Sequence, residues 1–138
     1  MSTAVSNVAT VQAIYEAFGR GDVPAILGHL SPDVTWEHWA DNRAQQAGVP
    51  WMQPRSGPEG ALEFFKIIGT WVPERFEVVA LMDGGDRVAA EVVAAFKLPS
   101  GRRFAEEEVH VWRFDGDGKV ASFRHYLDTA KHIEVARP

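Results

Sequence analysis

Apolar residues recur along this chain with two different periods, and the change of period separates a helical part from a strand-rich part. Near the N-terminus, apolar side chains three and four residues apart predict an amphipathic helix that ends at Gly19 and Gly21: Val11, Ile14, Tyr15 and Phe18. Asp22 can then cap a second, shorter helix that turns Ile26, Leu27 and Leu30 inward. Alternation from Val34 to Trp39 predicts a short strand with Val34, Trp36 and His38 on one face.

The stretch from Ala40 to Gly57 shows neither period. Two prolines, two glycines and several polar residues predict a long loop, and a loop of this length in a compact domain usually has a function. It also contains Trp51 and Met52, which a fully solvated loop would not need. We therefore expect this segment to form a lid. Helical spacing returns from Pro58 to about Thr70.

After Pro73 the pattern is strand-like as far as Asp128. The runs Phe76–Met82 and Val88–Leu98 are rich in β-formers and flank a Gly-Gly turn. Two more strands follow, joined by the turn of residues 115–118. Helices first and an antiparallel meander afterwards predict an α+β fold with helices packed on one face of a curved sheet. The tail after Thr129 is expected to be a short, partly ordered extension.

Composition narrows the class of protein. A chain of 138 residues with 46% hydrophobic and 24% charged residues is expected to form one globular domain over residues 1–138, with its core at about 8–130. The net charge of −5 argues against nucleic acid as a partner, because phosphate binding needs a basic surface. With no cysteine, no signal-peptide pattern and no long apolar run, we expect a cytoplasmic protein that does not contact a membrane.

Titratable side chains lie among aromatic ones in the last two predicted strands. Glu108, His110, Trp112 and Phe114 share one face of the first strand, and Phe123, His125 and Leu127 share one face of the second. Such a pattern is typical of a small-molecule pocket and equally of a well-satisfied core. Each of His38, His110 and His125 is a candidate general base near neutral pH, and Glu108 or Asp128 is placed to orient one of them.

Other features carry less chemistry. Three histidines can hold a metal ion, but no close spacing forces these three together, so neither a metal nor a cofactor is expected. His29 and His132 are interpreted as surface residues. Of the three consecutive glutamates, Glu107 is expected in solvent, and Glu106 or Glu108 is the candidate to point inward.

A family resemblance adds to this interpretation. The segment VQAIYEAFGRGDVPAILGHLSPDVTW (residues 11–36) resembles the opening of the SnoaL-like branch of the NTF2-like superfamily, to which ketosteroid isomerase and limonene epoxide hydrolase also belong. The Gly57–Gly60 entry to a helix and the segment EVHVWRFDGDGKVASFRHYLDT also resemble this family. The resemblance implies an NTF2-like (cystatin-like) cone, with three N-terminal helices on a curved antiparallel sheet around a pocket. It also implies a homodimer formed through the outer sheet face.

The same resemblance implies a set of site residues. The position of the isomerase's general base corresponds to His38, that of its pocket acid to His110, and an acid of related hydrolases and cyclases to His125. The resemblance therefore implies that these three histidines are catalytic. The expected ligand-binding residues are Tyr15, Phe18, Trp36, Trp51, Glu108, Trp112, Phe123 and Leu127.

The predicted function is a SnoaL-like pocket for a small, largely apolar carbonyl- or ring-containing molecule, with histidine-mediated proton transfer of the isomerase, cyclase or hydrolase type. The alternative is a non-catalytic ligand-binding module of the same fold.

Overall fold

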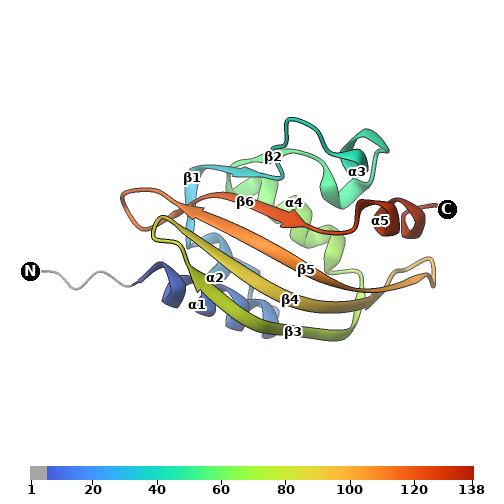
Figure 1. Ribbon diagram of the computed structural model, residues 1–138, viewed down its shortest axis with the longest axis horizontal. Coiled ribbons are helices and arrows are strands. Elements are labelled where there is room, and N and C mark those ends of the chain that lie inside the picture. Colours follow the sequence, from blue (N-terminus) through green and yellow to red (C-terminus); the bar gives the residue numbers. More distant parts are fainter. Residues whose placement is uncertain (1–5) are drawn as a thin grey trace, which may run out of the picture.

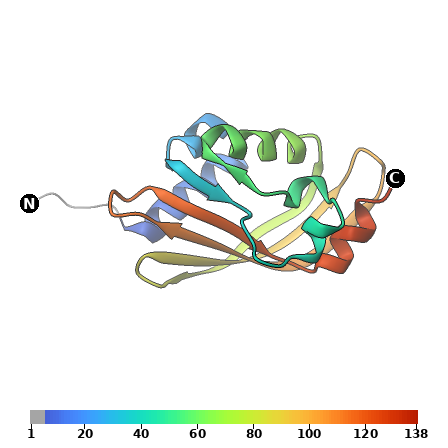
Figure 2. The same cartoon turned by 90° about the horizontal axis from the view of Figure 1, so that it is seen from above.

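A computed structural model describes residues 6–138 as one curved, six-stranded sheet with helices on one side (Figures 1 and 2). The strands lie in the order β2-β1-β6-β5-β4-β3. Their bounds are β1 Leu30–Trp36, β2 Arg55–Ser56, β3 Val72–Asp83, β4 Arg87–Lys97, β5 Arg103–Phe114 and β6 Val120–Tyr126. The helices are α1 Asn7–Gly19, α2 Val23–Leu27, α3 Arg43–Gln46, α4 Gly57–Ile68 and α5 Thr129–Val135. A 3-10 turn, η1, spans Pro50–Met52.

Local signals explain where the helices begin. The Ser6 hydroxyl accepts a hydrogen bond from the Ala9 N–H and caps α1, and the Asp22 carboxylate does the same for α2 at Ala25. Gly57 opens α4 with a φ of 73°, a conformation that glycine adopts without steric cost. None of the helices in the described part of the chain is both long and apolar enough to cross a membrane.

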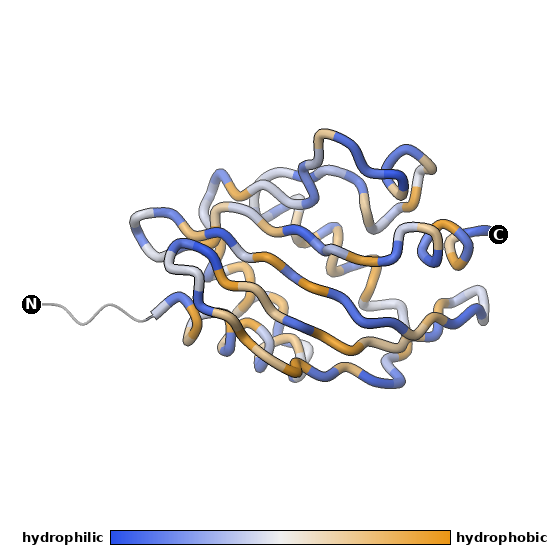
Figure 3. Tube along the Cα trace, in the orientation of Figure 1, coloured by the Kyte–Doolittle hydropathy of each residue, from blue (hydrophilic) through white to orange (hydrophobic). Residues whose placement is uncertain are grey.

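Strand alternation turns one set of side chains toward the helices, and stretches of hydrophobic residues follow the central strands (Figure 3). On β5 every even position from Phe104 to Phe114 is buried, and on β4 every even position from Val88 to Phe96 is buried. The odd positions face away from the helices, and Glu91 is exposed among them. The α+β class and the meander of β3 to β6 are therefore confirmed.

The structure differs from the sequence-based expectation in four places. The second helix ends at Leu27, and Leu30 begins β1. β1 runs parallel to β6, so the sheet is mixed, and the pairing register shifts around Pro32, which has no N–H to donate. The expected loop at 40–57 contains α3, η1 and β2, and it buries Trp51 and Met52. The expected loose tail forms α5, which the Asp128 carboxylate caps at Lys131.

The centre of the core is an aromatic stack. The Trp36 and Phe123 rings lie with centroids 4.2 Å apart, and the Trp112 ring lies 4.4 Å from that of Phe123. Phe123 is 2% exposed and joins β6 to both neighbouring strands. Truncating this ring leaves a cavity that the surrounding rings cannot close by small movements.

We therefore expect Phe123→Ala to lower the free energy of unfolding by about 3–5 kcal/mol, measured by urea denaturation. Val79→Ala on β3 is the control: its side chain is 51% exposed, and we expect a change within about 0.5 kcal/mol. Equal effects of the two substitutions would contradict this description of the core.

Candidate functional site

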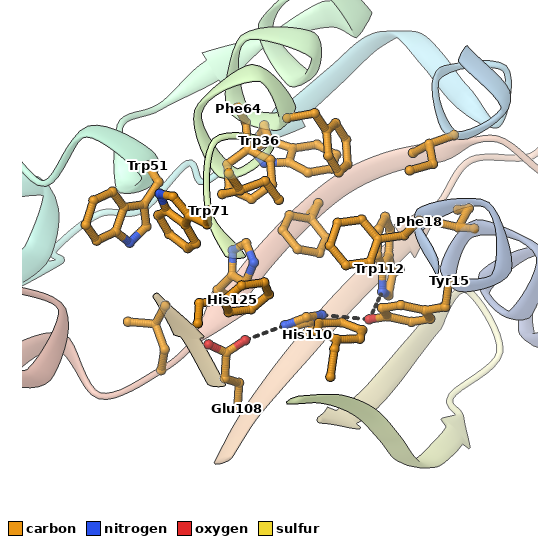
Figure 4. A pocket seen from close by; sticks show the side chains of 18 of the residues that line it. Tyr15, Phe18, Trp36, Trp51, Phe64, Trp71, Glu108, His110, Trp112 and His125 are labelled. Carbon is orange, nitrogen blue, oxygen red and sulfur yellow. Dashed lines mark hydrogen bonds and ion pairs between the residues drawn. The ribbon is translucent and has the colours of Figure 1, made fainter. Parts of the chain in front are cut away.

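A cavity lies between the helices and the concave face of the sheet (Figure 4). Its volume is about 60 Å³, and 12 of its 20 lining residues are Phe, Tyr or Trp. The eight residues expected to bind a ligand all line it: Tyr15, Phe18, Trp36, Trp51, Glu108, Trp112, Phe123 and Leu127. Sequence alternation did not identify Trp71, which lines the cavity from the turn after α4 and packs against Trp51 at 4.8 Å between ring centroids.

Three histidines border this cavity, and each contacts a buried glutamate. His125 Nδ1 lies 3.1 Å from Glu37 Oε2, and His110 Nε2 lies 2.7 Å from Glu108 Oε1. His132 Nε2 contacts Glu106 Oε1. An unpaired buried charge is costly, so this pairing is what allows six titratable groups to stay in an aromatic interior.

Glu37 reaches His125 because the backbone changes conformation at residue 37. Its φ is 59°, the one positive φ at a non-glycine residue in the described chain. Its N–H donates to the Phe123 carbonyl at 2.9 Å, and its own carbonyl accepts from Gln45. Strained backbone of this kind persists where surrounding contacts hold it, frequently at functional sites. The Glu37 carboxylate is fully buried.

The positive φ at Glu37 also changes the side to which His38 points, and the expected inward position of His38 is wrong. Simple alternation after Trp36 would bring His38 inward, but the left-handed residue at 37 interrupts the alternation. His38 Nε2–H donates instead to the Arg55 carbonyl at 2.8 Å, with Ser56 Oγ at 3.4 Å. His38 is not among the residues that line the cavity. The expected convergence of His38, His110 and His125 is therefore wrong, because Glu37 occupies the inward position.

His125 is held by Glu37 through two contacts. Glu37 Oε1 accepts from the His125 backbone N–H at 2.7 Å, and Oε2 faces the ring Nδ1. Burial alone would lower the pKa of His125, but the negative charge and hydrogen bond of Glu37 outweigh burial and raise it. The other ring nitrogen, Nε2, has no hydrogen-bond partner among residues 6–138.

His110 lies directly opposite His125 on the neighbouring strand, with ring centroids 4.6 Å apart. Trp112 Nε1–H donates to the Tyr15 hydroxyl at 3.0 Å, so the Tyr15 O–H is directed to His110 Nδ1 at 2.7 Å. His110 then carries its proton on Nε2 and donates to Glu108. Burial lowers the pKa of His110 and raises that of Tyr15, so both groups stay neutral.

The pKa of Glu108 is lowered, whereas burial usually raises the pKa of an acid. Burial alone would raise its pKa, but the hydrogen bond from His110 and nearby positive charge lower the pKa to about 2. Glu106 and Glu108 both point inward, and Glu107 between them is exposed.

His132 was expected on the surface, and this expectation is wrong. α5 packs against β5 and leaves His132 only 2% exposed. Trp51 Nε1–H donates to His132 Nδ1 at 2.9 Å, so the ring is neutral and its Nε2–H points to Glu106. The Asp128 cap and the apolar residues Ile133 and Val135 were the sequence signals for this helix.

Two groups of side chains bring possible metal ligands within 4.8 Å of one another: Glu108 with His110 and His125, and Glu106 with Glu108 and His132. In the second group, Trp51 occupies the lone pair of His132 Nδ1, so Nε2 holds the proton and has no lone pair for a metal. In the first group His110 Nε2 already donates to Glu108. The donors and acceptors fit a hydrogen-bonded network.

Comparisons with known proteins agree on the family and the fold. The model of the SnoaL-like domain family matches residues 11–123 of this chain. An NTF2-like protein of unknown function from Burkholderia pseudomallei is 26% identical, with 98% of this chain and all of that chain covered and a TM-score of 0.81. No curated protein sequence matches the chain.

Two further structures share the fold at lower identity. TerC, co-crystallised with polyporic acid, is 24% identical, with 94% and 97% of the two chains covered and a TM-score of 0.76. A Δ5-3-ketosteroid isomerase from Mycobacterium sp. is 20% identical, with 92% and 97% covered and a TM-score of 0.71.

The contact between Glu37 and His125 gives a direct test. Glu37→Gln removes the charge that favours the imidazolium, so we expect the His125 titration midpoint to fall by about one pH unit or more. NMR of the ring carbon signals measures this midpoint. Glu91→Gln, which changes an exposed residue of the outer face, should leave it unchanged.

Glu37→Gln should also lower the free energy of unfolding by an amount that depends on pH. Because the folded state raises the pKa of His125, the stabilisation is fully present below the ordinary value of about 6.5 and is lost as pH rises through the raised value. The destabilisation by Glu37→Gln should therefore be larger in acid. An unchanged midpoint in this variant would contradict the assigned pairing.

Proposed function

This chain belongs to the SnoaL-like domain family, and we propose that it binds a small, largely apolar molecule with a ring or carbonyl group and moves a proton on it through a histidine. The observation that carries the proposal is the environment of His125. Its Nδ1 faces the buried Glu37 carboxylate at 3.1 Å, and its Nε2 has no partner among residues 6–138. A carboxylate behind one ring nitrogen orients an imidazole whose other nitrogen acts on a substrate.

The walls of the cavity support an apolar ligand. Aromatic rings surround the polar groups and exclude water, which increases the effect of any charge or donor on a bound molecule. That TerC was co-crystallised with polyporic acid adds support, since a protein of this fold was studied there with a small organic acid.

The geometry assigns a role to each polar group. Neutral His125 takes a proton from the carbon next to a carbonyl, and Glu37 stabilises the imidazolium that forms. His110 has both ring nitrogens engaged by Tyr15 and Glu108, so it acts as a positioning residue for Glu108. The indole N–H of Trp36 is buried and unpartnered within residues 6–138, and it is the donor available to the developing enolate oxygen.

Ligand entry requires the walls to move. A cavity of about 60 Å³ is smaller than the roughly 150 Å³ that accommodates a benzene ring. Trp51 and Trp71 form a contacting pair at one end of the cavity (Figure 4). Their displacement should change tryptophan fluorescence when a ligand binds.

A non-catalytic binding module is the second candidate, favoured by the large aromatic share of the walls. It differs from the first candidate in one measurable respect. A binder holds a ketone without exchanging its protons, whereas a histidine base exchanges them with solvent.

The test uses cyclic ketones, with α-tetralone as the probe. Tryptophan fluorescence reports binding, and NMR in D₂O reports exchange of the protons next to the carbonyl. We expect His125→Gln to slow protein-dependent exchange by about 10²–10⁴-fold while binding persists, because the base is lost. His38→Gln is the matched control and should keep the wild-type rate, since His38 lies outside the cavity lining.

Binding of the cyclic ketones without exchange by the wild-type protein would favour the second candidate. Equal loss of exchange in both histidine variants would contradict the role of His125.

We also propose a homodimer formed through the outer face of the sheet. Small and β-branched residues of β4 support it, since Ala89, Val93 and Ala95 are only partly exposed there. Glu91 lies on this face and not in the cavity, so it would belong to the interface.

A further inference from the structure

Two buried glutamates of β5 lie side by side at one wall of the cavity. Glu106 and Glu108 occupy successive inward positions of β5 and are 9% and 7% exposed. Glu108 lines the cavity, and Glu106 does not. One carboxylate oxygen of each lies within 4.8 Å of the other. Both also approach the same atom of α5, because His132 Nε2 contacts Glu106 and lies 3.9 Å from Glu108 Oε2.

The hydrogen bonds around the neighbouring histidines fix their charge. Trp51 Nε1–H donates to His132 Nδ1, and Tyr15 O–H, directed by Trp112, donates to His110 Nδ1. A ring nitrogen that accepts a hydrogen bond carries no proton, so both histidines are neutral. Neither can serve as the cation for an adjacent carboxylate.

Other charged groups near this pair are engaged elsewhere. His125 is held by Glu37. On α5, the Lys131 ammonium donates to the Ala105 carbonyl and the Asp128 carboxylate caps the helix. On α3, which also packs against α5, Arg43 donates to Gln46 in solvent. Glu106 and Glu108 are therefore two adjacent buried acids, and the one cation near them, His125, is paired with Glu37.

We propose that Glu106 and Glu108 share one proton across a carboxyl–carboxylate hydrogen bond, and that this pair is the acid that complements His125 as the base. Two carboxyl groups in contact cannot both ionise cheaply in a dry interior. Burial raises the pKa of Glu106, and the neighbouring Glu108 charge raises it further, whereas the pKa of Glu108 is lowered. The proton consequently resides on Glu106 and its hydrogen bond points to Glu108.

The acid role rests on the proposed function, and its protons balance. Glu108 protonates the ligand as it receives the O–H proton of Glu106, so the pair loses its one proton and is briefly fully ionised, while His125 holds the proton taken from the ligand. The pair is then restored by transfer from His125, because the nearest ligating atoms of Glu108, His110 and His125 lie within 4.8 Å of one another. No proton is gained or lost over one isomerisation.

Infrared spectroscopy tests the shared proton without any ligand. The wild-type protein at neutral pH should show the carbonyl stretch of a protonated carboxylic acid, shifted in D₂O. Glu106→Gln, which mimics the protonated acid in shape, should abolish this band. Glu107→Gln is the matched control, because residue 107 lies between the two on the same strand and is exposed. The control should retain the band.

A further variant covers the case in which Glu106→Gln does not fold. Glu37 is the remaining buried glutamate of the described chain, so a band that survives both Glu37→Gln and Glu107→Gln belongs to the pair. Absence of the band in wild type, or its persistence in folded Glu106→Gln, overturns the proposal.

Exchange of α-tetralone protons separates the two proposals. We expect Glu106→Gln to slow exchange at least tenfold, with a smaller loss than in His125→Gln. Exchange in wild type without the infrared band overturns the shared proton and leaves the base role of His125 standing. A band in wild type without any exchange supports the shared proton and contradicts the proposed function.

Discussion

The pairing of each cavity-lining histidine with a buried glutamate is the constraint on which the other features of this site depend. An aromatic interior excludes water, so a charge left there without a partner would cost several kcal/mol. Glu106 and Glu108 come from β5 and Glu37 directly follows β1, whereas their histidines come from β5, β6 and α5. The pairs therefore join the end of β1, the centre of the sheet and the C-terminal helix into one network.

Indole and phenol donors give the three pairs different chemistry. Trp51 and Tyr15 each direct a proton at one histidine and keep it neutral, whereas His125 meets only a carboxylate. The result is one imidazole that can gain or lose a proton while two others hold acids in place. The three histidines are therefore not equivalent, because Nδ1 faces a hydrogen-bond donor in His110 and His132 and a carboxylate in His125.

Strand and helix periodicity predicted the fold class, the motif resemblance predicted the family, and together they placed eight residues that line the cavity. The periodicity continues unbroken through β5, which is why Glu108, His110 and Trp112 were assigned to one face correctly. It failed at Glu37, where one residue of positive φ exchanges the inward and outward positions. His132 was missed because a seven-residue helix gains its stability from packing against β5, and a short helix has a weak sequence pattern.

Neutron diffraction from a wild-type crystal at about pH 6, below the raised pKa of His125, tests the central claim most directly. The account predicts deuterium on both nitrogens of His125, and on Nε2 alone in His110 and His132. A doubly deuterated His110 or His132, or a protonated Glu37 beside a neutral His125, would contradict it.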